Sequence, residues 1–194
     1  MSEKAENKAE NSLGKQSILL PQPVYIRNSA SVVGKKEGEG PLSLLFDLIG
    51  EDDMFGADTW EEAESTLQKD AIYMALKKAA MEPQQIRFLC AGDLLGQSMA
   101  SSFGVASFNI PLIGLYGACS TCGEGLMVAS MLISAGYADT AVSVTSSHFA
   151  SAEKEFRYPL EYGNQRPLSA SWTVTGSGAF VLANDIGSGA RAKR

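Results

Sequence analysis

Residues 114–136, GLYGACSTCGEGLMVASMLISAG, decide the fold. An apolar run over 110–116 leads into this stretch, and Cys119 follows directly after Gly117 and Ala118. The pattern predicts a buried strand, a tight turn, and a helix whose first turn carries Cys119. The helix has almost no polar face, and such helices are typical of protein interiors. We therefore expect it to be a buried, nucleophile-type helix at the centre of the fold.

Cys119 has two interpretations. At a helix N-terminus, free N–H groups and the helix dipole favour an anion, which would make its thiol more acidic than that of Cys90 inside an apolar strand. The alternative is an inert core thiol, because free cysteine is among the most buried residue types.

Composition indicates one globular domain. The chain has 194 residues, of which 45% are apolar. We expect a disordered tail over 1–15, a single domain over 16–186 and a polar tail over 187–194. No apolar run is long enough to span a bilayer, which favours a cytosolic or membrane-peripheral protein. Three cysteines do not make a disulfide framework and are typical of a reducing compartment.

Charge excludes some partners. The net charge is −6, and no basic stripe is present to neutralise phosphates, so nucleic acid is not an expected partner. The acidic loop over 51–58 lacks the alternate spacing and central glycine of an EF-hand loop. We therefore predict neither a metal site nor a cofactor.

Hydrophobic patterning predicts strands alternating with helices. Thr59 and Glu62 form a capping box that opens a helix ending at Ala80. A second helix is expected over 97–106 and follows a strand over 86–91. The remaining predicted strands lie at 24–26, 31–33, 110–116, 140–146 and 174–184. This alternation is typical of an α/β fold, with a mainly parallel mixed sheet and helices on both faces.

Asp93, Cys119 and His148 each follow a predicted strand by a few residues. The carboxyl ends of parallel strands meet at one edge of the sheet, where α/β proteins bind their ligands. We therefore expect these three side chains to form a site. Taken singly, Asp93 also fits a helix cap, Cys119 a core thiol and His148 a loop histidine.

Several blocks resemble a known family. A strand followed by GACST and a small-residue helix resembles the nucleophile turn of the thiolase superfamily, and 173–185 resembles a strand of the same fold. More narrowly, the sequence is similar to the stage V sporulation protein AD family, a thiolase-like family of endospore-forming bacteria. The blocks are GPLSLLFD (40–47), AGDLLGQ (91–97), LYGACST (115–121), TSSHFASAEKEFRYPLEYG (145–163) and TVTGSGA (173–179).

The resemblance implies a function. Members resemble thiolases in having two alike halves, and this chain corresponds to the first. They bind dipicolinate (pyridine-2,6-dicarboxylate), and we expect Ca²⁺ to accompany it. The family acts in transport into the developing spore and in release on germination. It lies on the cytoplasmic side of the spore inner membrane, beside inner-membrane channel proteins. A homodimer or a complementary second half is the further expected partner.

The resemblance also assigns residues. By matching motif, the ligand-binding residues are Asp93, Cys119 and His148. Dipicolinate carries two carboxylates, of which the helix N-terminus at Cys119 can take one. His148, or Arg157 and Arg166 as weaker candidates, can take the other through charge-assisted bonds. Asp93 cannot attract a dianion, so we expect it to orient His148 or to hold an accompanying metal ion.

Two alternatives belong to other functional classes. One is an acyltransferase of the thiolase or ketoacyl synthase type with Cys119 as nucleophile. We do not expect this activity from the chain alone, because the partner histidine of such enzymes lies in the second half. The other is a redox protein using the Cys119–Cys122 pair, since CxxC at a strand-to-helix turn is also the thioredoxin arrangement.

Overall fold

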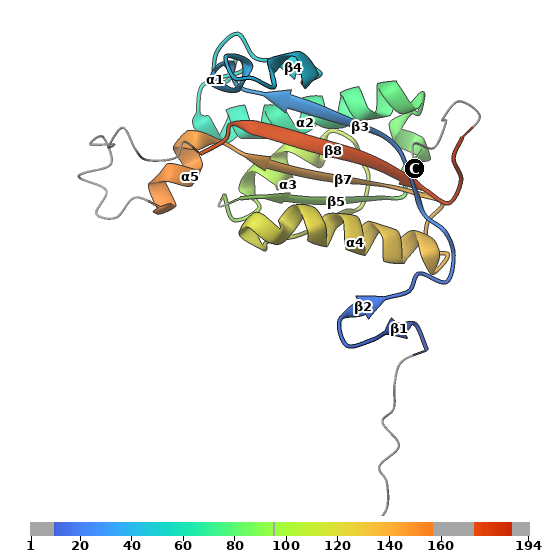
Figure 1. Ribbon diagram of the computed structural model, residues 1–194. Coiled ribbons are helices and arrows are strands. Elements are labelled where there is room, and N and C mark those ends of the chain that lie inside the picture. Colours follow the sequence, from blue (N-terminus) through green and yellow to red (C-terminus); the bar gives the residue numbers. More distant parts are fainter. Residues whose placement is uncertain (1–9, 95, 157–172, 188–194) are drawn as a thin grey trace, which may run out of the picture.

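The computed structural model describes residues 10–94, 96–156 and 173–187. Its centre is a six-stranded sheet with the strand order β4-β3-β8-β7-β5-β6 (Figure 1). Strand β8 runs antiparallel to both β3 and β7, whereas the pairs β3–β4, β5–β7 and β5–β6 are parallel. The strands are β3 (Tyr25–Val33), β4 (Leu48–Ile49), β5 (Phe88–Asp93), β6 (Leu112–Gly114), β7 (Thr140–Ser147) and β8 (Gly176–Ala183).

Helices cover both faces of this sheet. Figure 1 shows α4 in front of the sheet, with α2 and α3 behind it. The predicted mainly parallel mixed sheet with helices on both faces is therefore confirmed. The helices are α1 (Lys35–Gly38), α2 (Trp60–Ala79), α3 (Met99–Ala106), α4 (Thr121–Ser134) and α5 (Phe149–Phe156), and the 3₁₀ turns are η1 (Ser43–Leu45), η2 (Pro83–Gln85) and η3 (Ala118–Ser120).

Helix α2 begins where the sequence predicts. The Thr59 side chain accepts a hydrogen bond from the backbone N–H of Glu62, at 3.2 Å, and so caps the helix. The Glu62 carboxylate accepts from the N–H of Asp58, one residue before the position that the capping box requires. One of the two predicted capping bonds is thus present as expected.

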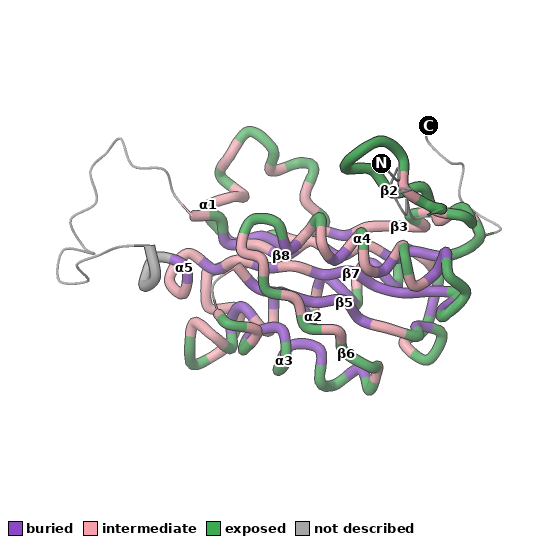
Figure 2. Tube along the Cα trace, turned by 90° about the horizontal axis from the view of Figure 1, so that it is seen from below, coloured by how far each residue is buried: buried purple, intermediate pink, exposed green. Residues whose placement is uncertain are grey.

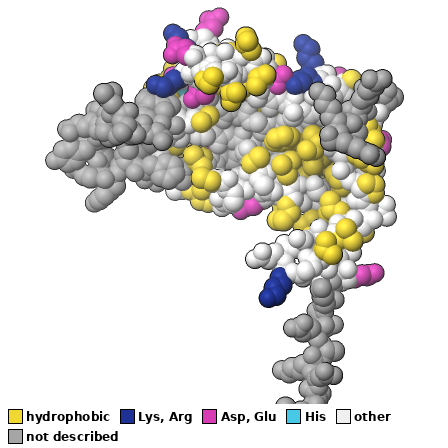
Figure 3. Space-filling model, in the orientation of Figure 1, with side chains coloured by type: hydrophobic (Ala, Val, Ile, Leu, Met, Phe, Trp, Pro, Cys, Tyr) yellow, Lys and Arg dark blue, Asp and Glu magenta, His cyan; other side chains and the backbone are white. Residues whose placement is uncertain are grey.

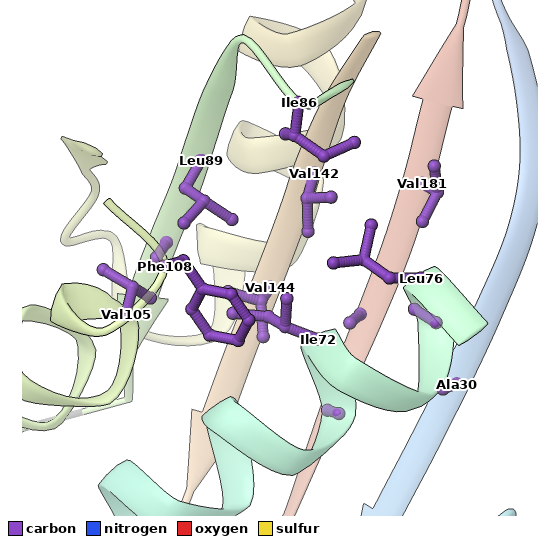
Figure 4. Close-up of a cluster of buried hydrophobic side chains, with 14 of the residues drawn as sticks. Ala30, Ile72, Leu76, Ile86, Leu89, Val105, Phe108, Val142, Val144 and Val181 are labelled. Atoms are coloured by element: carbon purple, nitrogen blue, oxygen red, sulfur yellow. The ribbon is translucent and has the colours of Figure 1, made fainter. Parts of the chain in front are cut away.

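The main core lies between the sheet and α2. Leu89 of β5 points toward α2 together with Val142 of β7 and Val181 of β8 (Figure 4). The next residue along β5, Cys90, packs in a second cluster with Ala129 of α4. Successive strand residues therefore serve opposite faces, as the pleat requires. In Figure 2 the central strands are mostly buried between the two helix layers.

Helix α4 differs from the predicted helix in its exposure. One stripe packs on the sheet, where Gly125 faces Ser143 so closely that an added Cβ would overlap the serine Oγ. On the opposite side, Met127 is 48% exposed and Met131 is 43% exposed. The helix is therefore buried along one side only in the described part of the chain, because nothing described there packs against the other.

The strand before Cys119 is shorter and less buried than predicted. Over 110–116 we expect a buried strand, but β6 has only three residues and none of them is fully buried. The reason is its position at the edge of the sheet, where it pairs with β5 alone. Nearer the N-terminus, the strands predicted at 24–26 and 31–33 are the two ends of the single strand β3.

A small hairpin precedes the sheet. Strands β1 (Ser12–Leu13) and β2 (Ser17–Ile18) pair antiparallel, so regular structure begins inside the segment 1–15 that we predict to be disordered. Figure 3 shows hydrophobic side chains gathered over this hairpin and α4. The helices among the described residues are too short or too polar to cross a bilayer.

Candidate functional site

A pocket of about 360 Å³ opens beside Cys119, at the ends of strands β3, β7 and β8. We call it the Cys119 pocket. Its walls come from the α4 side of the sheet, where Thr145, Gly178 and Ser31 lie opposite one another across three strands. The η3 turn and the start of α4 close the remaining side with Ala118, Cys119, Thr121 and Cys122.

Cys119 is exposed and lies in the η3 turn rather than in the first turn of a helix. Helix α4 begins two residues later, at Thr121, whose Oγ1 accepts from the N–H of Gly117 at 3.0 Å. The N-cap residue, Ser120, makes no capping bond through its side chain. The N–H of Thr121 donates to the carbonyl oxygen of Ala118, and the Glu124 carboxylate of the first turn accepts from Ser120 Oγ at 2.6 Å.

Asp93 borders the pocket but is fully buried and directed toward α3. Its carboxylate accepts from the N–H of Ser98 at 3.1 Å, from the N–H of Ser101 at 3.2 Å and from Ser101 Oγ at 2.9 Å. These bonds cap the start of α3, where the N-cap residue Ser98 makes no side-chain cap of its own. The helix-cap interpretation of Asp93 is thus the one that the geometry supports.

His148 does not line the pocket. It is fully buried, with Nε2 2.8 Å from the carbonyl oxygen of Asp53, and its Nδ1 accepts from the N–H of Ala150 at 3.2 Å. The ring forms a three-membered cluster with Trp60 and Phe149, at centroid distances of 5.2 and 5.0 Å, and those two rings lie 5.5 Å apart. Burial lowers the pKa of His148, and the two bonds fit a neutral ring with its proton on Nε2. Its position excludes direct contact with a ligand in the Cys119 pocket.

The pleat of the sheet explains this separation. Asp93 pairs in register with Ser146, and both side chains face the α2 side. His148, two residues after Ser146, follows them to that side, whereas Cys119 lies on the α4 side. The three predicted site residues therefore reach the same edge of the sheet, but they do not meet at one site.

Two hydroxyl side chains of β7, rather than those of Asp93 and His148, lie on the pocket side of the sheet. Thr145 and Ser147 alternate with Ser146 and His148 along TSSH, and so they belong to the pocket side of β7. The Oγ of Ser147 is buried and has no hydrogen-bond partner. Sequence reasoning missed both residues, although the period of two along a strand would have identified them.

The remaining candidates have simple outcomes. Arg157 and Arg166 lie outside the described residues. Cys119 and Cys122 are both free thiols. Within the described ranges, no group of three or more His, Cys, Asp or Glu side chains is placed to hold a metal ion.

Comparison with known proteins identifies the family. The model of the stage V sporulation protein AD family matches residues 14–192. The stage V sporulation protein AD of Bacillus subtilis (strain 168) is 41% identical over 174 residues, which are 90% of this chain and 52% of that protein. This chain belongs to the stage V sporulation protein AD family. It spans about half the length of the curated relative that it matches.

Solved structures show the fold of this family member. A 3-oxoacyl-(acyl carrier protein) synthase III from Xanthomonas oryzae pv. oryzae matches with a TM-score of 0.56 and 20% identity, over 85% of this chain and 57% of that chain. A priming β-ketosynthase of the R1128 polyketide pathway matches with a TM-score of 0.56 and 13% identity, over 88% and 52%. The fold is therefore thiolase-like, and the thioredoxin-type fold that the redox alternative needs is ruled out.

Proposed function

We propose that this family member is a sporulation protein that binds dipicolinate in the Cys119 pocket without catalysing a reaction on it. Family membership carries the proposal, and the pocket supplies a place for the ligand. Beside the start of α4, the site offers the side-chain hydroxyls of Thr145 and Ser147, and the Ser147 hydroxyl has no hydrogen-bond partner. Donors of this kind suit one carboxylate of the ligand.

The second carboxylate needs a different partner from the one that sequence reasoning favours. Burial lowers the pKa of His148, and its two ring nitrogens are engaged with Asp53 and Ala150, so it cannot serve. Arg157, Arg166 or a residue of an additional subunit remain as candidates. Asp93 is occupied in capping α3, so its effect on the ligand is indirect.

The surroundings of Cys119 favour binding over catalysis. The chain has one histidine, and its two ring nitrogens are engaged with Asp53 and Ala150 on the other side of the sheet. No imidazole of this chain therefore reaches the Cys119 thiol to act as general base. General acid–base catalysis by such a residue contributes roughly 10²–10⁴-fold in rate.

Partners and location are also proposed. The exposed apolar side of α4 and the edge of β6 are surfaces that a second copy or a complementary half would cover. In this proposal the assembly works at the cytoplasmic side of the spore inner membrane, with channel proteins, in dipicolinate transport and germination. Ca²⁺ enters as a companion of the ligand.

Calorimetry with dipicolinate tests the proposal, with pyridine-2-carboxylate as a one-armed control. Loss of a hydrogen bond to a charged group costs about 1.5–3 kcal/mol, so Ser147→Ala should weaken binding roughly tenfold to a hundredfold. Ser102→Ala is the matched control, because Ser102 is exposed on α3 and its Oγ donates to the carbonyl oxygen of Ser98 rather than into the pocket. Equal affinity for the two ligands, or no binding with and without an added second half, would contradict the proposal.

Acyl transfer is a second candidate, because Cys119 is exposed at the turn before α4 in a fold whose solved relatives include ketoacyl synthases. Incubation with acetyl-CoA followed by intact-mass measurement distinguishes the two functions. We expect no acyl adduct on Cys119. A stable adduct that is absent in Cys119→Ala would favour the enzyme.

A further inference from the structure

Helix α5 is capped by an imidazole ring. The helix begins at Phe149, and the carbonyl oxygen of the preceding residue, His148, accepts the first helical hydrogen bond from the N–H of Ala152 at 2.9 Å. The Nδ1 atom of His148 accepts from the N–H of Ala150, the second residue of the helix, at 3.2 Å. His148 therefore occupies the N-cap position, and its ring has the role that a Ser, Thr, Asp or Asn side chain usually has there.

This cap requires a neutral ring. Because the N–H of Ala150 donates to Nδ1, that nitrogen carries a lone pair, and the ring hydrogen lies on Nε2, 2.8 Å from the carbonyl oxygen of Asp53. A proton taken up from solvent binds to Nδ1, since no other ring nitrogen has a lone pair. The Nδ1–H group and the N–H of Ala150 would then be two donors facing each other. Protonation of His148 therefore breaks the bond that caps α5.

The position of the ring makes a positive charge unfavourable. The N-terminus of a helix carries the positive end of the helix dipole, so an imidazolium at the N-cap of α5 is repelled. His148 is also fully buried and packs against the rings of Trp60 and Phe149, so its charge would be removed from water. The docked position of α5 thus favours the neutral ring through its hydrogen bonds, through the helix dipole and through burial.

The charged groups near the ring reduce this preference without reversing it. Burial lowers the pKa of His148, and the bond to the carbonyl of Asp53 opposes this effect. The carboxylates of Asp53 in the loop before α2, Glu37 on α1 and Glu61 on α2 oppose it as well. The side chains of 149–152, in the first turn of α5, are uncharged. The net direction therefore agrees with the geometry of the cap.

The ring connects three parts of the molecule. Nε2 of His148 holds the carbonyl of Asp53 in the acidic loop, and Nδ1 holds the first turn of α5. His148 also directly follows Ser147, whose unpartnered hydroxyl lies on the pocket side of β7. A change in the docking of α5 therefore acts on the chain next to the Cys119 pocket.

We propose that His148 is an acid-sensitive latch, whose neutral ring holds α5 on the sheet and whose uptake of one proton releases the first turn of α5. In the released state the ring reaches water and both of its nitrogens donate. The binding of one proton to Nδ1 is the only chemical step. The latch does not depend on which ligand the Cys119 pocket binds.

Nitrogen NMR of the untagged wild-type chain tests the ring directly. His148 is the only histidine, so ¹⁵N-histidine labelling gives the signals of one imidazole. Above pH 7 we expect a hydrogen on Nε2 and an unprotonated Nδ1, and this state should persist below about 6.5, the ordinary histidine pKa. A hydrogen on Nδ1 instead, or a ring that titrates at its ordinary pKa while α5 stays docked, would overturn the proposal. No variant needs to fold for this result.

Hydrogen exchange against pH tests the release of α5. The released state binds the proton more tightly than the docked state, so docking is complete above the ordinary histidine pKa and weakens as pH falls below it. For one proton, the opening constant should rise up to about tenfold per pH unit below about 6.5. Protection factors of the Ala150 and Ala152 amides should fall accordingly, while those of α4 stay unchanged. A parallel loss in α4 would indicate general acid unfolding and contradict a latch.

Two substitutions at His148 separate the cap from the bond to Asp53. His148→Asn places an acceptor close to the position of Nδ1 and cannot take up the proton, so α5 should stay protected as pH falls. His148→Gln can still donate to the Asp53 carbonyl but loses the cap, so α5 should open about fivefold more readily already at neutral pH. All nearby carboxylates remain in both variants. An acid response of His148→Asn equal to that of the wild type would assign the response to those carboxylates and overturn the latch.

Discussion

The two faces of the sheet are built differently. On the α2 side, the main core and buried polar side chains, among them Glu64, Gln68 and Asp93, lie between the helix and the sheet. On the α4 side, α4 is the one helix among the described residues that covers the sheet, its outer side is exposed, and the Cys119 pocket opens next to it. The difference shows that the residues ordering the strand ends and the residues able to touch a ligand lie on opposite sides of the same strands.

The largest expected effect concerns core packing on the α2 side. Leu67 is fully buried on α2, and Leu67→Ala should lower the free energy of unfolding by about 2–5 kcal/mol. Met127 on the outer side of α4 is the contrasting position, where Met127→Ala should change it by no more than about 0.5 kcal/mol. Chemical denaturation measures both. Similar losses would mean that the outer side of α4 is covered in solution.

Cysteine reactivity compares a residue beneath α4 with one in the pocket. Burial raises the pKa of the Cys90 thiol to about 11, whereas Cys119 is exposed. Because the thiolate is the reactive form, Cys119 should alkylate about a hundredfold faster than Cys90, or more, near neutral pH. Peptide mapping after timed alkylation gives both rates. Equal alkylation rates would contradict the proposed place of Cys119 at the open pocket.

Substitutions at two glycines of α4 compare its sheet-facing side with its outer side. An added Cβ at Gly125 would overlap Ser143 Oγ, so Gly125→Ala should destabilise by about 1–3 kcal/mol. At Gly123 a Cβ would meet nothing within 4 Å, and Gly123→Ala should stabilise by about 0.5–1 kcal/mol. Thermal unfolding of the two variants shows whether each substitution stabilises or destabilises the fold. A loss at Gly123 would indicate a partner packed on that side.

The smallest effect concerns the starts of the two long helices. Thr59 caps α2 through its side chain, so Thr59→Ala should cost about 1 kcal/mol. Ser120 at the start of α4 has no such bond. Ser120→Ala should therefore change the free energy of unfolding by no more than about 0.5 kcal/mol, and thermal unfolding measures both variants. A loss at Ser120 as large as that at Thr59 would contradict this difference between the two helix starts.

The order of the elements was predictable because it rests on local signals. The Thr59 cap, the strands ending at Asp93 and near His148, and the helix after Cys119 all follow from periodicity and turn residues close in sequence. The exposure of β6 was not predictable in the same way. Whether a strand lies at the centre or at the edge depends on which strands pair, and that is a matter of long-range contacts.

The sequence by itself determined that Asp93, Cys119 and His148 reach one edge of a thiolase-like sheet, because each follows a strand that runs toward that edge. Only the tertiary structure decided which of them share a cavity. A side chain at a strand end points to one face or the other according to the register and to the helix packed there. For this reason Asp93 caps α3 and His148 bonds Asp53 on the α2 side, while Cys119 stands with Ser147 at the open pocket.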